Sequence, residues 1–129
     1  MRSYILFFLF SSVLLFAEIN LPHQGRVSVN NKPFTGNAEF RFALIDQFQN
    51  LVWNHNSGER EPTTGVQLSV QGGFYNYDLN VPNQILNLPH LKLRIWFDDG
   101  KHGLFQLGQD QPLPKLPYSV ISDLTNDPR

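Results

Sequence analysis

Regular alternation of apolar and polar residues is the dominant pattern of this chain, and it is clearest near the C-terminus. From residue 91 to residue 97 every odd position is apolar, and the turn sequence Asp98-Asp99-Gly100 follows. This period of two is typical of a β-strand with one buried face. A three-residue loop would pair Phe105 with Leu93 and keep it on the apolar face, whereas a two-residue loop would turn it to the other face. The pattern therefore predicts a long β-hairpin closed by three residues.

The same alternation predicts further strands between clusters of Gly, Pro and Asn. The clearest runs over residues 37–46, where the even-numbered residues from Ala38 to Leu44 are apolar and share one face. The others are expected at residues 25–29, 51–53, 66–70 and 75–79. No window has the pattern of a long amphipathic helix. About seven or eight short strands of this kind predict an all-β fold, either an antiparallel β-sandwich or a small barrel.

Three segments between or after these strands are expected to be irregular. Residues 54–64 are mostly polar and predict an exposed loop. Residues 80–89 predict a crossing loop with one helical turn, because Pro82 removes a backbone donor and ends the preceding strand. Residues 111–119 contain three prolines and cannot form a central strand. They predict an extended strap over a sheet edge that would otherwise invite pairing with other chains.

The first 17 residues have the order of a secretory signal peptide. Arg2 supplies one positive charge, and the residues from Tyr4 to Ala17 are apolar apart from two serines. A run of about 14 apolar residues is shorter than the roughly 20 that span a bilayer as a helix. We therefore expect a signal peptide over residues 1–17, a β-sandwich domain over residues 18–122 and a disordered tail over residues 123–129. An uncleaved membrane anchor is the alternative interpretation of the leader.

Charge and cysteine content narrow the class of partner. The chain has 10 basic and 11 acidic residues, and loss of Arg2 with the leader would make it slightly more acidic. This balance does not suggest nucleic acid or an anionic membrane surface as a partner. The sequence has no cysteine, which excludes disulfides and lipidation of a cysteine. The core alone must therefore hold the domain, and no stable membrane span is expected after signal cleavage.

Residues that often carry chemistry have structural explanations in this sequence. The four histidines lack the spacing of a zinc motif, and no serine-nucleophile or phosphate-binding motif is present. Asp98 and Asp99 are accounted for by the turn, where adjacent carboxylates point apart. Arg26 and Asp46 are expected to form a structural ion pair across the sheet. We therefore expect no enzymatic activity, no cofactor and no metal site.

Aromatic residues are the better candidates for a binding site. Trp96 and Arg94 occupy the polar face of their predicted strand, and Trp53 ends another strand beside the polar loop. Many β-sandwiches bind sugars or proteins through an exposed aromatic platform. Large aromatic residues in small domains are mostly buried, so we expect Trp96 to belong to the core. If Trp96 or Trp53 is exposed instead, Trp96, Trp53 and Arg94 become a candidate ligand site.

Several segments of the mature chain resemble, in order, the motifs of a known β-rich module. They are Ile19 to Val27 (INxQGRL/V), Lys32 to Gly36 with Phe40 to Asp46 (GxPFxG and FxFALxD), Trp53 (LW), Gly73 to Leu79 (NGLYSVxL), Leu93 to Phe105 (LRVWFDDGxxGF) and Gln111 to Ser119 (QPLxxxPYA). The module is found in secreted bacterial surface proteins, often ahead of repeats or tail-fibre-like regions. Asp110 and Ser119 depart from its closing motif, which has Arg and Ala. The resemblance implies a surface or structural role and brings no catalytic residue.

These observations together predict an exported, non-enzymatic structural or interaction module of the bacterial cell envelope or surface. The protein is expected in the periplasm, on the outer surface or outside the cell, with a protein or glycan partner at the cell surface. A carbohydrate-binding or adhesive module that uses exposed aromatic residues is the alternative. A glycosidase-like enzyme is less favoured, because it would need two facing carboxylates about 5 to 9.5 Å apart, and the sequence places none there. Pairing of exposed strand edges is a further hypothesis and would produce a dimer.

Overall fold

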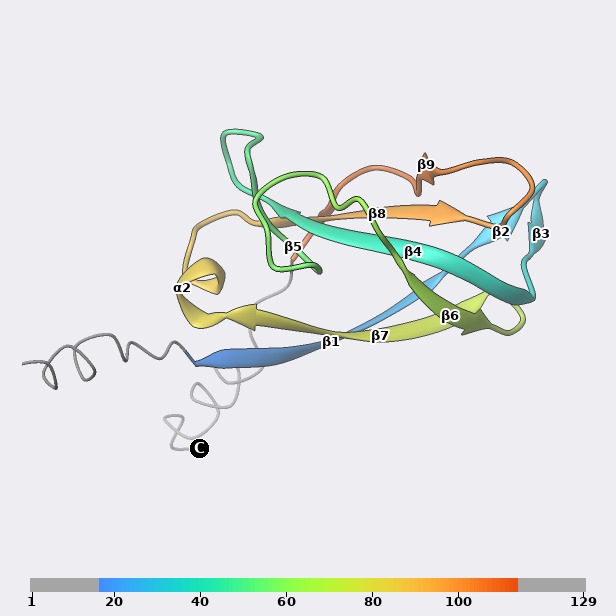
Figure 1. Ribbon diagram of the computed structural model, residues 1–129, viewed down its shortest axis with the longest axis horizontal. Coiled ribbons are helices and arrows are strands. Elements are labelled where there is room, and N and C mark those ends of the chain that lie inside the picture. The colour runs from blue at the N-terminus through green and yellow to red at the C-terminus, as the bar shows by residue number, and fades with distance from the viewer. Residues whose placement is uncertain (1–16, 114–129) are drawn as a thin grey trace, which may run out of the picture.

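The computed structural model describes residues 17–113 and has an antiparallel all-β fold (Figure 1). Its strands are β1 (Glu18–Arg26), β2 (Ser28–Val29), β3 (Lys32–Pro33), β4 (Gly36–Ile45), β5 (Leu51–Asn54), β6 (Val66–Val70), β7 (Phe74–Pro82), β8 (Lys92–Asp98), β9 (Phe105–Gln106) and β10 (Gln111–Pro112), with one helical turn, α2 (Asn83–Leu86). The predicted fold class is therefore confirmed. Residues 1–16 of the predicted signal peptide, the end of the strap and the tail at 123–129 lie outside the described residues.

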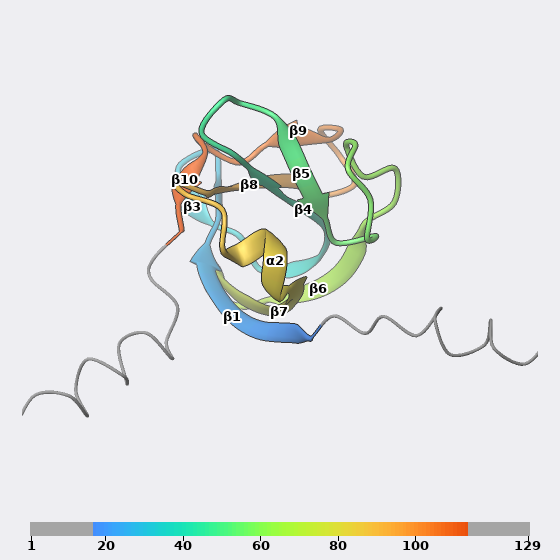
Figure 2. The ribbon, with the colours of Figure 1, turned by 90° about the vertical axis from the view of Figure 1, so that its left-hand side faces the viewer.

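Two layers of strands enclose the core. One layer is the two-stranded sheet β1–β7, and the other is a larger sheet in the order β10–β8–β4–β5, to which β6 and β9 add by pairing with β4 and β8. The view down the body places β1 and β7 on one side, β4, β5 and β8 on the other, and α2 across the near end (Figure 2). Strands β2 and β3 form a separate short hairpin. Within residues 17–113, no helix has the length and apolar character that crossing a membrane would require.

Strand β4 is the centre of the larger sheet. It pairs with β8 along one side, while its other side pairs first with β6 and then with β5. Between these two partners, His55 completes the ladder: its backbone amide donates to the Phe42 carbonyl at 3.0 Å, and its Nδ1 accepts from the Phe42 amide at 3.2 Å. The predicted apolar face of β4 is buried. Ala43 and Ile45 on the opposite face are buried as well, so this end of the strand is covered on both sides.

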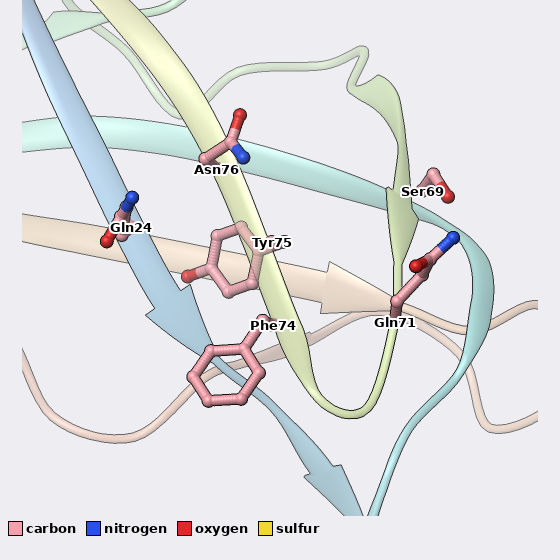
Figure 3. Close-up of a pocket in the computed structure, with 6 residues that line it drawn as sticks. All are labelled: Gln24, Ser69, Gln71, Phe74, Tyr75 and Asn76. Carbon is pink, nitrogen blue, oxygen red and sulfur yellow. The ribbon is translucent and has the colours of Figure 1, made fainter.

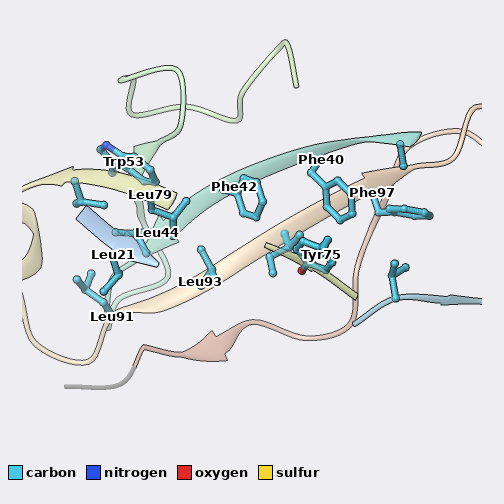
Figure 4. Packing of buried hydrophobic residues seen from close by; sticks show 14 of the residues in the cluster. Leu21, Phe40, Phe42, Leu44, Trp53, Tyr75, Leu79, Leu91, Leu93 and Phe97 are labelled. Atoms are coloured by element: carbon cyan, nitrogen blue, oxygen red, sulfur yellow. The ribbon is translucent and has the colours of Figure 1, made fainter. Parts of the chain in front are cut away.

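Aromatic rings from both layers meet in the core, and Figure 4 shows Phe40 and Phe42 of β4 with Tyr75 of β7. The ring of Phe42 on β4 stacks on Tyr77 of β7 with centroids 4.9 Å apart, and the Phe40 ring lies 4.3 Å from that of Tyr75. These side chains come from the alternating inward positions that the sequence predicts for β4 and β7. Their removal from water is the main force that holds the layers together.

Strands β1 and β7 are longer than the alternation predicts. Strand β1 begins at Glu18 and pairs residue by residue with β7 as far as Pro82, so that the expected crossing loop starts later. Pro82 is tolerated because it is the last residue of the strand, where a missing donor interrupts no further pairing. The expected helical turn is present as α2, directly after the strand.

The predicted long hairpin is wrong in its loop length. Phe105 pairs with Phe97 instead of Leu93, the returning strand β9 has two residues, and residues 99–104 form the connection. The connection is wider because Asp99 Oδ1 accepts hydrogen bonds from two later backbone amides, those of Lys101 and His102. The predicted face is correct, since the Phe105 ring lies 5.7 Å from that of Phe97.

Two smaller expectations concern an ion pair and the strap. The ion pair between Arg26 and Asp46 is not formed: the Arg26 guanidinium lies over the Phe74 ring, and Asp46 Oδ1 accepts amide hydrogen bonds within its own turn. The strap covers the edge of β8 as predicted over residues 111–113, where Leu113 donates to the Leu91 carbonyl. Its remaining residues lie outside the described part of the chain.

Candidate functional site

Trp96 lies on the outer face of β8 and does not belong to the core. Its side chain is half-buried, and it is absent from the cluster of apolar residues that pack between the layers. Its cross-strand neighbours are Arg41 on β4 and Gln106 on β9. Directly opposite residues on one face have Cβ atoms about 5 Å apart, so the indole is flanked by two polar side chains. The expectation of a core role for Trp96 is therefore wrong, because the outer face of β8 is only partly covered.

Arg94, two residues before Trp96, is held by a bidentate ion pair with Asp110. Its Nε and Nη2 donate to the two carboxylate oxygens, each at 2.7 Å, and Gln106 Nε2 donates to the same carboxylate at 3.1 Å. The hydrogen bonds from Arg94 lower the pKa of Asp110. Asp110 is one of the two departures from the closing motif of the resembled module. Here its carboxylate fixes the segment before β10 to the face of β8.

Arg41, directly across from Trp96 on β4, is also held in place. Its guanidinium donates to Glu39 at 2.8 Å and to the Pro62 carbonyl at 2.9 Å. The second bond secures the connection between β5 and β6, which crosses β4 (Figure 1). Both guanidinium groups beside Trp96 are therefore fixed before any partner arrives. We name this surface the Trp96 face; its residues are Arg41, Arg94, Trp96, Gln106 and Asp110.

Trp53, the third predicted site residue, is separated from the other two. Strand β5 lies on the opposite side of β4 from β8, and the Trp53 side chain is only 6% exposed within the core. Trp53 does border a hollow of about 210 Å³ in the opening between β5 and β7. We name it the acidic hollow; its lining includes Glu18, Trp53, His55, Tyr77, Asp78 and Asn80. The structure thus brings Trp96 and Arg94 together and places Trp53 elsewhere.

His55 is the most unusual group of the acidic hollow. Since its Nδ1 accepts from the Phe42 amide, the ring proton of the neutral form resides on Nε2. That nitrogen is buried and has no hydrogen-bond partner among the described residues. Burial lowers the pKa of His55, so the ring is neutral at pH 7. In the part of the chain that the structure describes, no cluster of His, Cys, Asp or Glu could hold a metal ion.

A second hollow, of about 390 Å³, lies beside the turn between β6 and β7 (Figure 3). Phe74 is 58% exposed here, and amide side chains from three elements surround it: Gln24, Gln71 and Asn76. The Tyr75 hydroxyl is engaged with His23 at 3.1 Å, and burial raises the pKa of Tyr75 to about 12. Neither hollow is predicted by the sequence alone. The outward polar residues of β7 are visible in the sequence. Whether they line a hollow depends on which strands lie beside β7, and the sequence does not show this.

The two adjacent aspartates act on the backbone of their turn. Asp98 Oδ1 accepts from the Gly100 amide at 2.8 Å. Asp99 accepts from later amides, chiefly that of Lys101, and its Oδ2 lies 2.8 Å from His102 Nδ1; these contacts lower the pKa of Asp99 to about 2. The arrangement matches the turn role predicted from the sequence.

No family model, no curated protein and no solved structure matches the chain.

Proposed function

We propose that the protein is an exported, non-enzymatic interaction module of the bacterial cell envelope or surface. The observation that supports this most is the Trp96 face: a half-buried indole outside the core, with one fixed arginine directly across from it on β4 and another two residues before it on β8. Trp and Arg are the residues most enriched among those that dominate binding energy at protein interfaces. Because the guanidinium groups are already held in place, their side chains would lose little conformational entropy when a partner binds.

Export is supported by the position of the first strand. Strand β1 starts at Glu18, so cleavage after Ala17 would remove no strand residue. It would break one described hydrogen bond, from the Asn83 amide to the Ala17 carbonyl. The intact mass of the protein recovered from a bacterial periplasm or culture medium tests this step. A mass that begins at Glu18 is expected, and a mass that retains residues 1–17 would contradict the cleavage site.

A carbohydrate is the alternative partner. Aromatic faces flanked by polar side chains suit sugar rings, which offer apolar C–H faces and hydroxyl groups at their rims. Trp96 with Arg41 and Gln106 has this character, and so does Phe74 among its amides. A protein partner is favoured because Trp and Arg are enriched among the residues that dominate binding energy at protein interfaces.

The non-enzymatic part of the proposal is supported by the structural roles of four carboxylates. Asp46 and Asp99 accept from backbone amides of their own turns, and Glu39 and Asp110 are paired with arginines. For Asp99 and Asp110 these contacts lower the pKa, which suits structural pairing better than proton transfer. A glycosidase-like enzyme, the least favoured alternative, needs one carboxyl group that stays protonated near neutral pH.

The test compares Trp96→Ala with Phe48→Ala, which removes another aromatic ring, 72% exposed, from a distant turn. Binding of the purified protein to isolated bacterial envelopes and to a glycan array is measured for both variants and for the unmodified protein. We expect Trp96→Ala to weaken binding by about tenfold or more, as is usual for a dominant interface residue, while a cooperative urea transition shows that the variant still folds. Protease treatment of the envelopes then separates a protein partner from a glycan. Equal binding by the two variants would refute the role of the Trp96 face.

A further inference from the structure

One edge of β7 carries backbone groups that point away from β1. The amide and carbonyl of Phe74 both bond to Gln71, on the side of β6. Groups of successive strand residues point to alternate sides, and the pairing of β7 with β1 has no register shift. The amides and carbonyls of Asn76, Asp78 and Asn80 therefore point to the same side as those of Phe74.

Two other hydrogen bonds confirm this alternation. The Gly73 carbonyl accepts from Val27, which follows β1, and the Asn83 amide donates to Ala17, which precedes it. Odd-numbered residues at both ends of β7 thus face β1. The even-numbered residues between them must face the opening toward β5 and β6.

No described strand fills that opening. Beyond the tight turn at Gln71–Phe74, β6 leaves to pair with β4 and β7 leaves to pair with β1. Asn76, Asp78 and Asn80 are exposed, and within residues 17–113 no strand pairs with β7 on this side. An edge of this kind is a template for another strand.

The free edge of β1 differs, because a proline protects it. By the same alternation, even-numbered residues of β1 face away from β7, and Pro22 is among them. A proline at an outward position removes a donor from the edge and discourages pairing. The β7 edge has no such residue before its last position, Pro82. Of the two edges of this layer, the one on β7 is therefore the receptive one.

Charge indicates what can pair there. The carboxylates of Glu18 and Asp78 border the acidic hollow beside the edge, and no cationic group lies within 4 Å of either among the described residues. Two copies of β7 paired antiparallel about Asp78 would bring like charges together, which destabilises cross-strand pairs. The edge therefore disfavours a second copy of itself and favours a strand with a basic side chain.

We propose that the β7 edge binds an extended peptide segment of a partner protein as an added strand, with a lysine or arginine facing Asp78 and Glu18. This deepens the proposed function, since it rests on the chain being an interaction module. Backbone amides and carbonyls of Asn76, Asp78 and Asn80 supply the ladder. The basic side chain lies on the outer face beside Asp78, at the rim of the acidic hollow.

The test uses the full chain, labelled with ¹⁵N, and a nine-residue peptide of alternating threonine and valine with lysine at its centre. A matched peptide has glutamate at the centre. With the lysine peptide at about ten times its Kd, we expect hydrogen exchange to slow by about tenfold at the amides of Asn76, Asp78 and Asn80. The amides of Tyr77 and Leu79, already paired with β1, should change little.

Variants test the charge and separate this proposal from the Trp96 face. Asp78→Asn should weaken binding of the lysine peptide by up to about fivefold. The control is Glu59→Gln, because Glu59 is an exposed loop residue that borders neither hollow; this variant should bind the peptide as the unmodified protein does. Trp96→Ala should leave peptide binding unchanged, so the two proposals fail independently. Unchanged exchange at the three amides would overturn the proposal, and so would equal binding of the glutamate peptide.

Discussion

The substitution Gly25→Ala places a methyl group where the Tyr75 ring already lies. Gly25 on β1 is directly opposite Tyr75 on β7. An added Cβ would lie 2.5 Å from Cζ and 2.8 Å from Cε1 of that ring, well inside van der Waals contact. The ring has no room to withdraw, because it packs against Phe40 and its hydroxyl is bonded to His23. The glycine of the Gln24-Gly25-Arg26 motif is therefore explained by an aromatic ring that covers it from the next strand.

The expected destabilisation of Gly25→Ala is about 1 to 3 kcal/mol, the usual range for a methyl group forced into a packed site. Tyr75→Ala should cost more, about 3 to 5 kcal/mol, because it leaves a cavity in the core. Once the ring is gone, the methyl group of Gly25→Ala has space and should cost nearly nothing. The coupling energy between the two sites should therefore be about equal to the cost of Gly25→Ala alone.

The free energies of unfolding of the two single variants and the double variant can be measured by urea denaturation. Fluorescence of Trp53, buried in the core, reports the transition. Gln24→Ala, at the neighbouring exposed position, is the control and should change stability by less than about 0.5 kcal/mol. If Gly25→Ala were equally destabilising with and without the Tyr75 ring, the steric explanation would be refuted.

Three further predictions concern charged groups. Asp110→Asn should destabilise the fold by about 1 to 2 kcal/mol. This value lies between those of exposed and buried ion pairs, because the Arg94 and Asp110 side chains are 24% and 14% exposed. An unchanged urea midpoint would argue against a stabilising ion pair. Burial lowers the pKa values of His23 and His55, so the unfolded state binds more protons below about pH 6.5. The free energy of unfolding should therefore fall as the pH drops from about 7.5 to about 5, and a flat profile would contradict this. Asp46→Ala removes the acceptor of two amide hydrogen bonds at 2.9 Å and should cost about 1 kcal/mol by denaturation, whereas no loss would show that the turn holds without them.

The sequence and the structure agree where a property depends on a single strand. The inward residues of β4, β7 and β8 follow from the period of two, and all three strands bury the side that the alternation predicts. The structural role of the Asp98-Asp99-Gly100 turn was also predictable, because carboxylates that bond to nearby amides act over a few residues.

The candidate sites depend on neighbours that are distant along the chain. Alternation places Trp96 on the outer face of its strand, but its exposure depends on how far β9 and the connection between β5 and β6 cover that face. The partner of Phe105 differs from the predicted one because it, too, depends on a distant part of the chain. Alternation with a period of two specifies which face of the strand a residue occupies. It does not specify the pairing partner, because a shift of the register by any even number of residues keeps the same face. A longer loop therefore satisfied the pattern equally well.

The sequence by itself therefore determined the all-β class, the buried face of each long strand and the position of most turns, because these follow from local backbone geometry and the period of side chains. Tertiary structure alone decided that β1 and β7 form a separate layer, that Arg94 meets Asp110, and that the even-numbered residues of β7 face an opening. These features are set by which strands lie side by side. Strand pairing joins residues far apart in the chain, and alternation within one strand carries no information about the identity of its neighbour.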